Sequence, residues 1–378
     1  MSVDASLAHA VKITCSREEL SQALQVVGRA VSTRTSVQIL AGILLRVEGG
    51  IVHLAATDME MSLRVSFPAE TGEDGSIVVP GRLLLDIVRL LPPGQVVLQH
   101  EESEGVASLS CGTSSYRLHT YNADDFPRLP SVDTERLISL DRQAFLQTVA
   151  KVSRAASRDE SRPVLTGILV RLEGAKLIMA ATDSYRLSVK ETALSTAARE
   201  DLDAIVPARA LAEVARIAQT TTAETLELGV QENQVVFRID GVWLTARRID
   251  GQFPNYKQLR PETFEVELSV PRGELLDAVK RVGLMAQRNS PLRLRFEEGQ
   301  LTIQAQTQDV GEARESLPIS YSGDVLEVGF NPDFLREGLE SIDEDDVRLK
   351  LISPLRPGLV TGAGEDFWYL IMPIRLAG

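Results

Sequence analysis

The side chains that could do chemistry are present in this chain, but their spacing builds no recognised reactive site. The four histidines are dispersed, at His9, His53, His100 and His119. None of them has an Asp or Glu at a sequence spacing that suggests a metal site. Cys15 and Cys111 form no Cys-x-x-Cys pair, and the chain has neither a glycine-rich nucleotide loop nor a His-Glu-x-x-His motif. The sequence therefore predicts no catalytic residue, no metal and no cofactor.

One polar pair occurs twice. Thr57-Asp58 and Thr182-Asp183 each follow a strand pattern that ends in Ala-Ala, 125 residues apart. Short polar side chains at a strand end bond to nearby backbone and tighten a turn, so we favour a structural role for the aspartates over a catalytic one. The residues that follow differ, Met-Glu-Met at 59–61 and Ser-Tyr-Arg-Leu at 184–187, and a function could be carried there by one copy only.

The Thr-Asp pairs belong to a repeat that fills the chain. Residues 39–65 align with 164–189, 78–91 with 205–218, and 121–130 with 248–259. A weaker third copy has the same order of elements, a helix at 271–287, a hairpin at 292–307, a strand and helix at 326–342 and a final strand at 367–376. Repeats of this length predict repeated structural units, here three modules at residues 1–130, 131–260 and 261–378.

Each module is predicted to be an α+β unit with two helices packed on antiparallel sheet. Alternating apolar and polar runs joined by Glu-Gly turns indicate a sheet with one buried face. Caps and apolar spacing predict six helices, at residues 16–31, 81–91, 141–158, 208–219, 271–288 and 331–342. A linear array of modules would leave sheet edges open and a ring would pair them; the pattern alone allows both.

Composition and charge narrow the possible functions. The 378 residues are 44% hydrophobic, which excludes a disordered chain, and no apolar stretch is long enough to cross a membrane. The N-terminus does not resemble a signal peptide, so we expect a cytoplasmic protein. The net charge is −13, yet the six predicted helices sum to +5. Basic helices suit phosphate contact, and only 5% aromatic residues argue against single-strand stacking, which leaves sequence-independent contact with duplex DNA.

Several motifs, in this order and spacing, resemble one family. They are Ala-Thr-Asp-Met-Glu at 56–60, Asp-Asp-Phe-Pro at 124–127, Ala-Thr-Asp at 181–183 with Arg-Leu at 186–187, Gly-Gln-Phe-Pro-Asn-Tyr at 251–256, Tyr-Ser-Gly at 321–323, Gly-Phe-Asn at 329–331 and Met-Pro-Ile-Arg-Leu at 372–376. The resemblance runs from residue 11 to residue 376 and is to the bacterial sliding clamps, the beta subunits of DNA polymerase III (the DnaN family).

This resemblance implies a non-catalytic processivity factor for DNA replication. It implies the DNA-clamp fold in each module and a head-to-tail homodimer whose six modules form a ring around duplex DNA. The dimer contacts carried over are Tyr116 and Leu118 on one chain and Leu284 and Met285 on the other. The implied partners are double-stranded DNA, the DNA polymerase III alpha subunit, the clamp loader delta subunit, and other polymerases and repair proteins that carry short linear motifs.

The resemblance also implies two sets of binding residues. The DNA-contacting positions are Arg34, Arg82, Arg158, Arg162 and Arg209. The peptide-binding pocket between the second and third modules is implied to be lined by Leu165, Thr182, Tyr185, Arg186, Leu187, Pro254, Leu259, Tyr321, Leu355, Met372, Pro373, Ile374 and Arg375. Arg186 and Arg375 are expected near its rim, residues 372–376 are expected to form a strand, and Ser184 and Gln258 depart from the family's usual residues. A repeat-built peptide-binding scaffold with no DNA role is the alternative.

Overall fold

The computed structural model describes residues 11–376, except 34–35, 102–103, 131, 196, 198–200, 232, 287–289 and 309. Two compact units are present, one formed by Met1–Arg142 with Glu213–Arg248 and the other by Gln143–Ala212 with Ile249–Gly378. This division passes through the predicted middle module, because its strands are shared between the two units. The boundaries given above for the three modules therefore stay a prediction.

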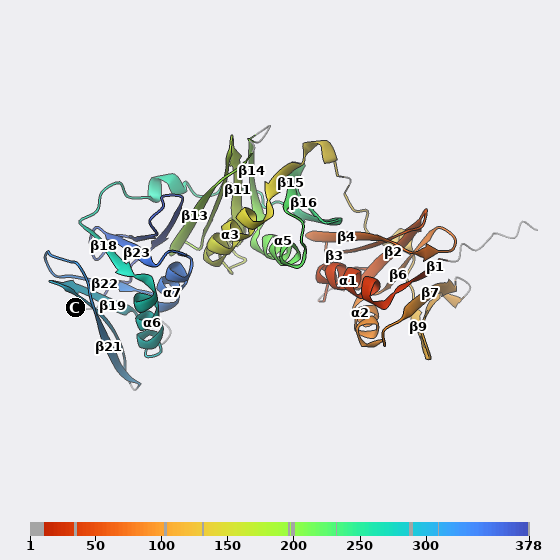
Figure 1. The fold of residues 1–378 in the computed structure, drawn as a ribbon, viewed down its shortest axis with the longest axis horizontal. Helices are drawn as coiled ribbons and strands as arrows, with labels where there is room; N and C mark the ends of the chain where they lie inside the picture. The colour runs from red at the N-terminus through yellow and green to blue at the C-terminus, as the bar shows by residue number, and fades with distance from the viewer. Residues whose placement is uncertain are drawn as a thin grey trace, which may run out of the picture. The chain divides into compact units, whose positions relative to one another are not determined.

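The first unit contains two antiparallel sheets (Figure 1). The larger has eight strands in the order β10-β15-β16-β17-β4-β3-β2-β6, with bounds β10 Ile138–Asp141, β15 Thr225–Gln231, β16 Gln234–Ile239, β17 Val242–Arg247, β4 Met61–Pro68, β3 Ile51–Thr57, β2 Gly42–Glu48 and β6 Gly75–Pro80. The smaller has the order β5-β1-β7-β8-β9, with β5 Glu70–Thr71, β1 Lys12–Ser16, β7 Gln95–Glu101, β8 Val106–Cys111 and β9 Ser114–His119.

Two helices of the first unit pack on these strands. Helix α1 (Arg17–Val27) begins at a capping box in which Ser16 and Glu19 each bond to the other's backbone, and it buries Leu20, Leu24 and Val27. Helix α2 (Gly81–Leu90) follows Pro80 and buries Leu84. Helix α5 (Ala208–Thr220) carries the chain from one unit into the other. Short 3-10 turns are η1 Gly28–Ala30, η2 Gln38–Ala41, η4 Ala123–Asp125 and η5 Thr134–Arg136.

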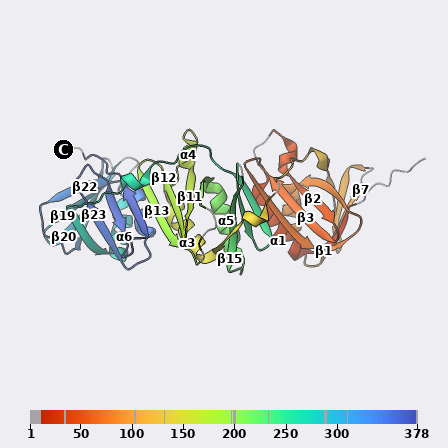
Figure 2. The ribbon, with the colours of Figure 1, turned by 90° about the horizontal axis from the view of Figure 1, so that it is seen from above.

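The second unit repeats this plan. Its eight-stranded sheet has the order β14-β11-β12-β13-β25-β24-β23-β18, and Figure 2 shows β11, β12 and β13 side by side. The bounds are β14 Leu202–Pro207, β11 Gly167–Glu173, β12 Lys176–Thr182, β13 Arg186–Ala193, β25 Phe367–Ile371, β24 Gly358–Thr361, β23 Asp346–Leu351 and β18 Val266–Pro271. A four-stranded sheet β21-β20-β19-β22 completes it, with β21 Gly311–Pro318, β20 Gln300–Thr307, β19 Leu292–Glu297 and β22 Leu326–Phe330.

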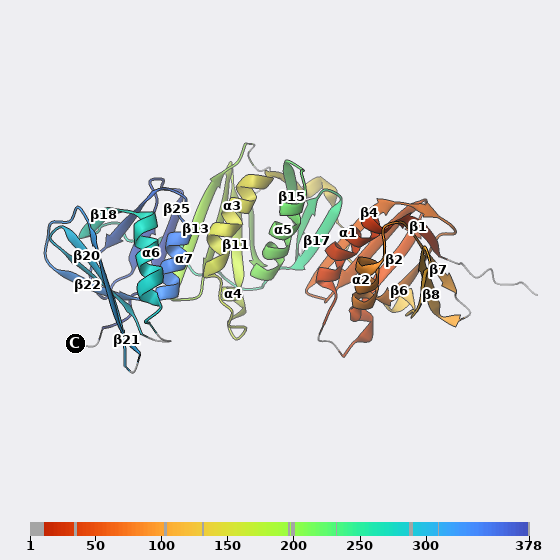
Figure 3. The ribbon, with the colours of Figure 1, turned by 60° about the horizontal axis from the view of Figure 1, so that its bottom comes forward.

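Helices α6 (Arg272–Gly283) and α7 (Pro332–Glu340) lie side by side in this unit (Figure 3). Asn331 caps α7 by accepting from the amides of Asp333 and Phe334, and Pro332 stands at its first position. Helix α3 (Arg142–Val152) buries Phe145, and the short elements are α4 Pro163–Thr166, η6 Ser153–Ala155 and η7 Tyr256–Leu259. All six predicted helices are present, each slightly different in extent from its predicted range.

The two large sheets are joined across modules in the same register. In the first unit β17 pairs with β4, and Trp243 lies opposite Arg64. In the second unit β25 pairs with β13, and Trp368 lies opposite Val189. Both members of the second pair are 125 positions further along the chain than those of the first. The sequence repeat is therefore also a repeat of strand pairing.

Candidate functional site

The Thr-Asp pairs build the same turn in both units, as the sequence predicted. Thr57 Oγ1 donates to the carbonyl of Met61 at 2.9 Å, and Asp58 Oδ1 accepts from the amides of Glu60 and Met61. Thr182 and Asp183 make the corresponding bonds to residues 185 and 186. Met59 and Ser184 adopt positive φ angles of 76° and 80°, a conformation disfavoured for side chains other than Gly, Asn and Asp. The aspartates thus stabilise strained turns.

In the second unit this turn is locked by Arg186, whose side chain is only 9% exposed. Its guanidinium bonds to Asp183 at 3.1 Å, to the carbonyl of Arg154 at 2.5 Å and to Glu337, and it lies 4.3 Å from the ring centroid of Phe334. Arg186, expected near a pocket rim, is thus mostly buried, and its ion pairs make burial of this cation possible. Sequence reasoning missed Phe334 and Glu337, which lie on α7 and carry no motif.

Beside the locked turn, large apolar side chains are exposed. Tyr185 is 60% exposed and its ring stacks on Phe334 with centroids 6.5 Å apart. The amide of Met372 donates to the carbonyl of Tyr185 at 2.8 Å, so these two residues are neighbours. Met372 is 41% exposed, and Leu259 and Leu355, also in this unit, are 48% and 62% exposed. Exposed apolar side chains of this size commonly mark interaction surfaces.

The remaining residues of the predicted pocket fall into different environments. Thr182 and Leu187 are buried, and Thr182 is used by its turn. Pro254, Leu165 and Tyr321 are half-buried, and the Tyr321 hydroxyl donates to the carbonyl of Asp324. The structure brings Tyr185, Arg186 and Met372 into one connected group, while its hydrogen bonds and ring contacts do not link Leu259, Leu355 or Pro254 to that group in the described chain.

The end of the chain differs from its prediction. Strand β25 ends at Ile371, so residues 372–376 do not form the expected strand. Instead, the amide of Ile374 donates to the carbonyl of Gly329 at 2.8 Å in an isolated bridge. A side chain at position 329 would meet Leu376 at 2.6 Å, so only glycine lets the tail approach. Pro373 is half-buried and Arg375 is exposed. The proline lacks the amide that a longer strand needs.

The first unit holds the counterpart of this surface, with different chemistry. A pocket of about 260 Å³ is lined there by the turn at 57–62, by Pro127–Pro130 and by the end of β17. The amide of Arg247 donates to the carbonyl of Glu60 at 2.9 Å, as that of Met372 does to Tyr185. Ser62 and Thr245 form a buried hydroxyl pair in the floor. At the positions of Tyr185 and Met372 this counterpart therefore has Glu60 and Arg247, while Met59 of its turn is 61% exposed.

The predicted DNA-contacting arginines are exposed, except that Arg34 lies outside the described residues. Arg82 and Arg209 are each the second residue of a helix, α2 and α5. Arg158 follows η6, and Arg162 binds Asp159 at 3.2 Å and the hydroxyl of Ser184 at 2.9 Å. Four of the five positions thus present cationic side chains that could meet phosphate.

The predicted dimer residues lie at strand and helix ends. Tyr116 and Leu118 lie on β9, where Tyr116 is 39% exposed and Leu118 is buried. Leu284 caps α6 and is 82% exposed, and Met285 packs against the core of its own unit. In the described chain, β9 pairs only with β8, and β21 pairs only with β20. Each of these two strands therefore has one edge without a partner strand among the described residues.

The described residues form no group of three or more His, Cys, Asp or Glu that could hold a metal ion. They also include no helix that is long and apolar enough to cross a membrane.

Family models match nearly the whole chain. The N-terminal, central and C-terminal domains of the DNA polymerase III beta subunit match residues 11–130, 139–255 and 257–375. The beta sliding clamp of Streptomyces coelicolor is 36% identical, covering 97% of this chain and 100% of its own. That of Synechococcus elongatus is 35% identical, with the same two coverages.

Solved structures agree with these sequence relatives. The DNA polymerase sliding clamp of Bacillus subtilis superposes with a TM-score of 0.93 at 26% identity, covering 98% of this chain and 100% of its own. The Pseudomonas aeruginosa sliding clamp bound to griselimycin has a TM-score of 0.91 at 28% identity, covering 97% and 100%. These findings confirm the three-module clamp fold and favour the clamp prediction over the scaffold without a DNA role. The chain belongs to the family of the DNA polymerase III beta subunit, the bacterial sliding clamps.

Proposed function

We propose that two copies of this chain close head to tail into a ring around duplex DNA and tether a DNA polymerase to it. The observation that carries this proposal is the repeated strand pairing between modules. The groups β6-β2-β3-β4 and β14-β11-β12-β13 each end on a strand that pairs with the next module, with β17 and with β25. The group β22-β19-β20-β21 has the same order but ends on an open strand. The open strand β9 begins the group β9-β8-β7-β1, and it holds the position that β17 and β25 hold in the groups β17-β16-β15-β10 and β25-β24-β23-β18.

A second copy supplies the missing pairing for each open strand. Tyr116 and Leu109 pair in the first hairpin as Leu244 and Phe237 do in the next, so Tyr116 corresponds to Leu244, 128 positions later. Leu244 lies opposite Leu63, and Ser188, 125 positions after Leu63, lies opposite Tyr369. Ala313 stands a further 125 positions on, so the register of the two internal joints predicts that Tyr116 of one copy lies opposite Ala313 of the other. Exposed Leu83 and Leu90 on α2 and exposed Leu284 after α6 provide apolar surface for this joint. Leu90 is exposed although its equivalent in the next module, Ile217, which stands 127 positions later, is only 5% exposed. Two such contacts close a ring with two-fold symmetry.

The duplex contact is proposed to be weak and independent of base sequence. Arg82 and Arg209 occupy the same position in their helices, 127 residues apart, so the repeat presents them in the same way. Arginine on phosphate fixes position without reading bases. A closed ring cannot leave a circular duplex, so strong contacts are unnecessary and weak ones permit sliding. The net charge of −13 keeps the rest of the surface from binding DNA.

The tethering site is proposed to be the apolar surface of the second unit, around Tyr185, Leu259, Leu355 and Met372. A partner's short linear segment would anchor its leucine or phenylalanine side chains there, as aromatic and aliphatic anchors do at interfaces. The Arg186 network supports this proposal because it fixes the turn that carries Tyr185. The alpha subunit of DNA polymerase III, the delta subunit of the clamp loader and repair proteins with similar segments are the proposed partners.

Retention on DNA tests the ring directly. The chain is loaded with a clamp loader on nicked circular DNA and on linear DNA of the same length, and both are passed through a gel-filtration column. We expect co-elution with the circle and loss from the linear form, because the ring slides off ends. Leu284→Asp with Met285→Asp should give a folded monomer that neither DNA retains. Equal retention of the normal chain on the linear and circular forms would contradict topological linkage.

A further inference from the structure

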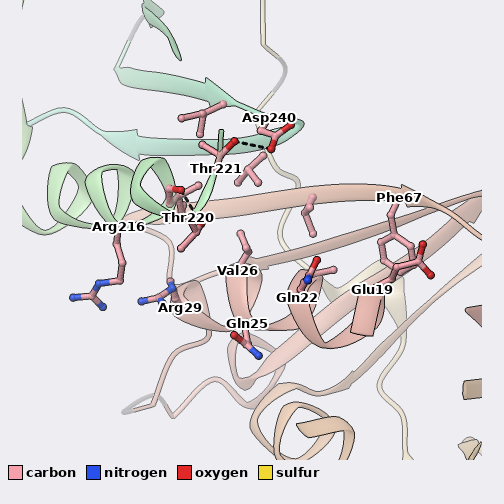
Figure 4. A pocket seen from close by; sticks show the side chains of 15 residues that line it. Glu19, Gln22, Gln25, Val26, Arg29, Phe67, Arg216, Thr220, Thr221 and Asp240 are labelled. Carbon is pink, nitrogen blue, oxygen red and sulfur yellow. Dashed lines mark hydrogen bonds between the residues drawn. The ribbon is translucent and has the colours of Figure 1, made fainter. Parts of the chain in front are cut away.

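A pocket of about 420 Å³ lies in the first unit between helix α1 and the end of helix α5 (Figure 4). Its apolar wall is formed by Val26 of α1, Val65 of β4, Ile217 of α5 and Val242 of β17. Ile217 and Val242 are buried, while Val26 and Val65 are half-buried and face the opening. This volume is within the range of small-molecule sites, which is about 300–1,000 Å³.

The pocket is open because small residues occupy positions where the second unit has large ones. The repeat places Val26 in the position of Lys151, and Val242 in that of Phe367. In the second unit the Lys151 amine lies 5.0 Å from the ring centroid of Phe367 and 2.8 Å from Asp343. A lysine paired over a ring thus fills the space that two valines leave empty in the first unit.

At other equivalent positions the two units differ in polarity. Val65 of β4 corresponds to Lys190 of β13, which forms an ion pair with Asp366. Ala23 and Phe67 correspond to Thr148 and Thr192, whose hydroxyls bond to one another at 2.6 Å. The second unit closes this region with polar pairs, whereas the first unit lines it with apolar side chains. The opening therefore follows from side-chain chemistry on the same backbone plan.

The two ends of the pocket differ in charge. At one end Arg29 and Arg216 lie close together (Figure 4), and both bind Glu213, at 3.2 Å and 3.4 Å. One carboxylate between two guanidiniums leaves one positive charge uncompensated, and the Arg216 side chain is 55% exposed. Away from the arginines the pocket is lined by two carboxylates, Glu19 of α1 and Asp240, which accepts from the hydroxyl of Thr221 at 2.7 Å. An anion is therefore favoured only at the arginine end.

From this geometry we infer that the pocket binds a small amphipathic monoanion, a flat apolar body that carries one carboxylate or sulfonate. The acid group meets Arg216 and Arg29, and the apolar body lies against Val26, Val65 and Val242. The site uses none of the residues proposed for the tethering surface or the strand joint. It stands on the pocket and its charges, and does not depend on the proposed function.

Fluorescent probes that differ in charge test this site on the full chain. The anion is 1-anilinonaphthalene-8-sulfonate, and the neutral control is N-phenyl-1-naphthylamine. We expect the anion to bind this site, and expect Arg216→Gln to weaken its binding by about tenfold, the effect expected for one charge-assisted bond. Binding of the neutral probe should be unchanged. Equal weakening for both probes, or no weakening for either, would overturn the preference for an anion.

Two filling variants test the location. Val242→Phe introduces the residue that the second unit has at the same position, and Val26→Leu adds volume to the same wall without adding charge. Each variant should remove one bound equivalent of the sulfonate while the melting temperature stays within a few degrees of the parent's. Tyr185→Ala on the apolar surface of the second unit is the matched control and should leave that equivalent in place. Unchanged stoichiometry in a folded filling variant would overturn the assignment, and if one variant does not fold, the other decides.

Discussion

The amide of Met372 donates to the carbonyl of Tyr185 at 2.8 Å, which fixes the chain just after β25 against the turn before β13. The first unit has the same bond between Arg247 and Glu60, at 2.9 Å. The backbone of the two sites is thus equivalent, and only the side chains differ. Selectivity for an apolar peptide would then come from tyrosine and methionine in place of glutamate and arginine.

The first prediction is that each chain binds one peptide. A Gln-Leu-x-Leu-Phe type peptide should bind the parent with one equivalent per chain by calorimetry. Met372→Arg with Tyr185→Glu gives the second unit the chemistry of the first, and it should weaken binding by at least about 2 kcal/mol, because it removes two anchor side chains worth about 1–2 kcal/mol each. Arg247→Ala in the first unit is the control and should leave affinity unchanged. Two equivalents on the parent would contradict the distinction.

A second prediction concerns the buried Arg186. Glu337→Ala leaves this guanidinium with Asp183 as its remaining carboxylate, and it should lower the free energy of unfolding by about 1.5–3 kcal/mol, because a charge-assisted hydrogen bond to a buried donor is lost. Arg186→Met should cost less, since methionine stands at the equivalent position 61 of the first unit. The double variant should then be no less stable than Glu337→Ala alone, as measured by calorimetric melting. A double variant whose destabilisation is the full sum of the two single effects would show that the two side chains are not coupled.

Much of this arrangement could be predicted from the sequence. Helices and strands followed from periodicity and caps, and the turn role of Asp58 and Asp183 followed from their place after a strand. The burial of Arg186 could not be predicted, because its partners Glu337 and Phe334 lie far along the chain on a helix whose polar face looks solvated. The open pocket could not be predicted either, since it depends on the sizes of Val26 and Val242, which only the fold brings together.

The third prediction is a pH dependence at the start of α1. The hydroxyl and amide of Ser16 both bond to the carboxylate of Glu19, and these bonds lower its pKa below the ordinary 4.5. A carboxyl whose pKa is lower in the folded state stabilises the fold above pH 4.5, and this contribution disappears as the pH falls through the folded pKa. Glu19→Gln should therefore lower stability at about pH 7, by about 0.5–1 kcal/mol as expected for a cap, and by less at about pH 3. Melting curves at both values test it, and an equal effect at the two would contradict the ionised cap.

The fourth prediction concerns duplex binding. Arg82→Gln with Arg209→Gln should reduce the slope of log affinity against log salt by about 0.9 for each phosphate that is no longer neutralised, with no change in base preference. Arg238→Gln is a suitable control, because this exposed arginine lies on strand β16 and pairs with Glu227 at 3.3 Å. Fluorescence anisotropy across salt concentrations gives both slopes. A control with the same reduced slope would show that the helix positions are not special.

The last prediction tests the register between two copies. Because Leu244, the equivalent of Tyr116, lies opposite Leu63 and Tyr369 lies opposite Ser188, the same rule places Tyr116 of one copy opposite Ala313 of the other. Directly opposed residues have Cβ atoms about 4.5–5.5 Å apart, close enough for a disulfide after a small adjustment. Tyr116→Cys with Ala313→Cys should therefore form two bonds per ring on mild oxidation. A species of twice the chain mass should appear on non-reducing gels and disappear with dithiothreitol.

The matched control for this test shifts the register by one residue. Tyr116→Cys with Arg314→Cys directs the two thiols to opposite faces of the sheet, because successive side chains alternate, so it should cross-link far more slowly. The native cysteines do not interfere, since Cys15 and Cys111 are both buried and burial raises the pKa of the Cys15 thiol to about 12, which keeps it protonated under mildly alkaline oxidation. Faster cross-linking of the shifted pair would show that the joint between copies does not follow the register of the joints within the chain. When the aligned pair is cross-linked on DNA circles, the protein should stay on the circle even in denaturant, since a covalently closed ring on a circle has no end from which to leave.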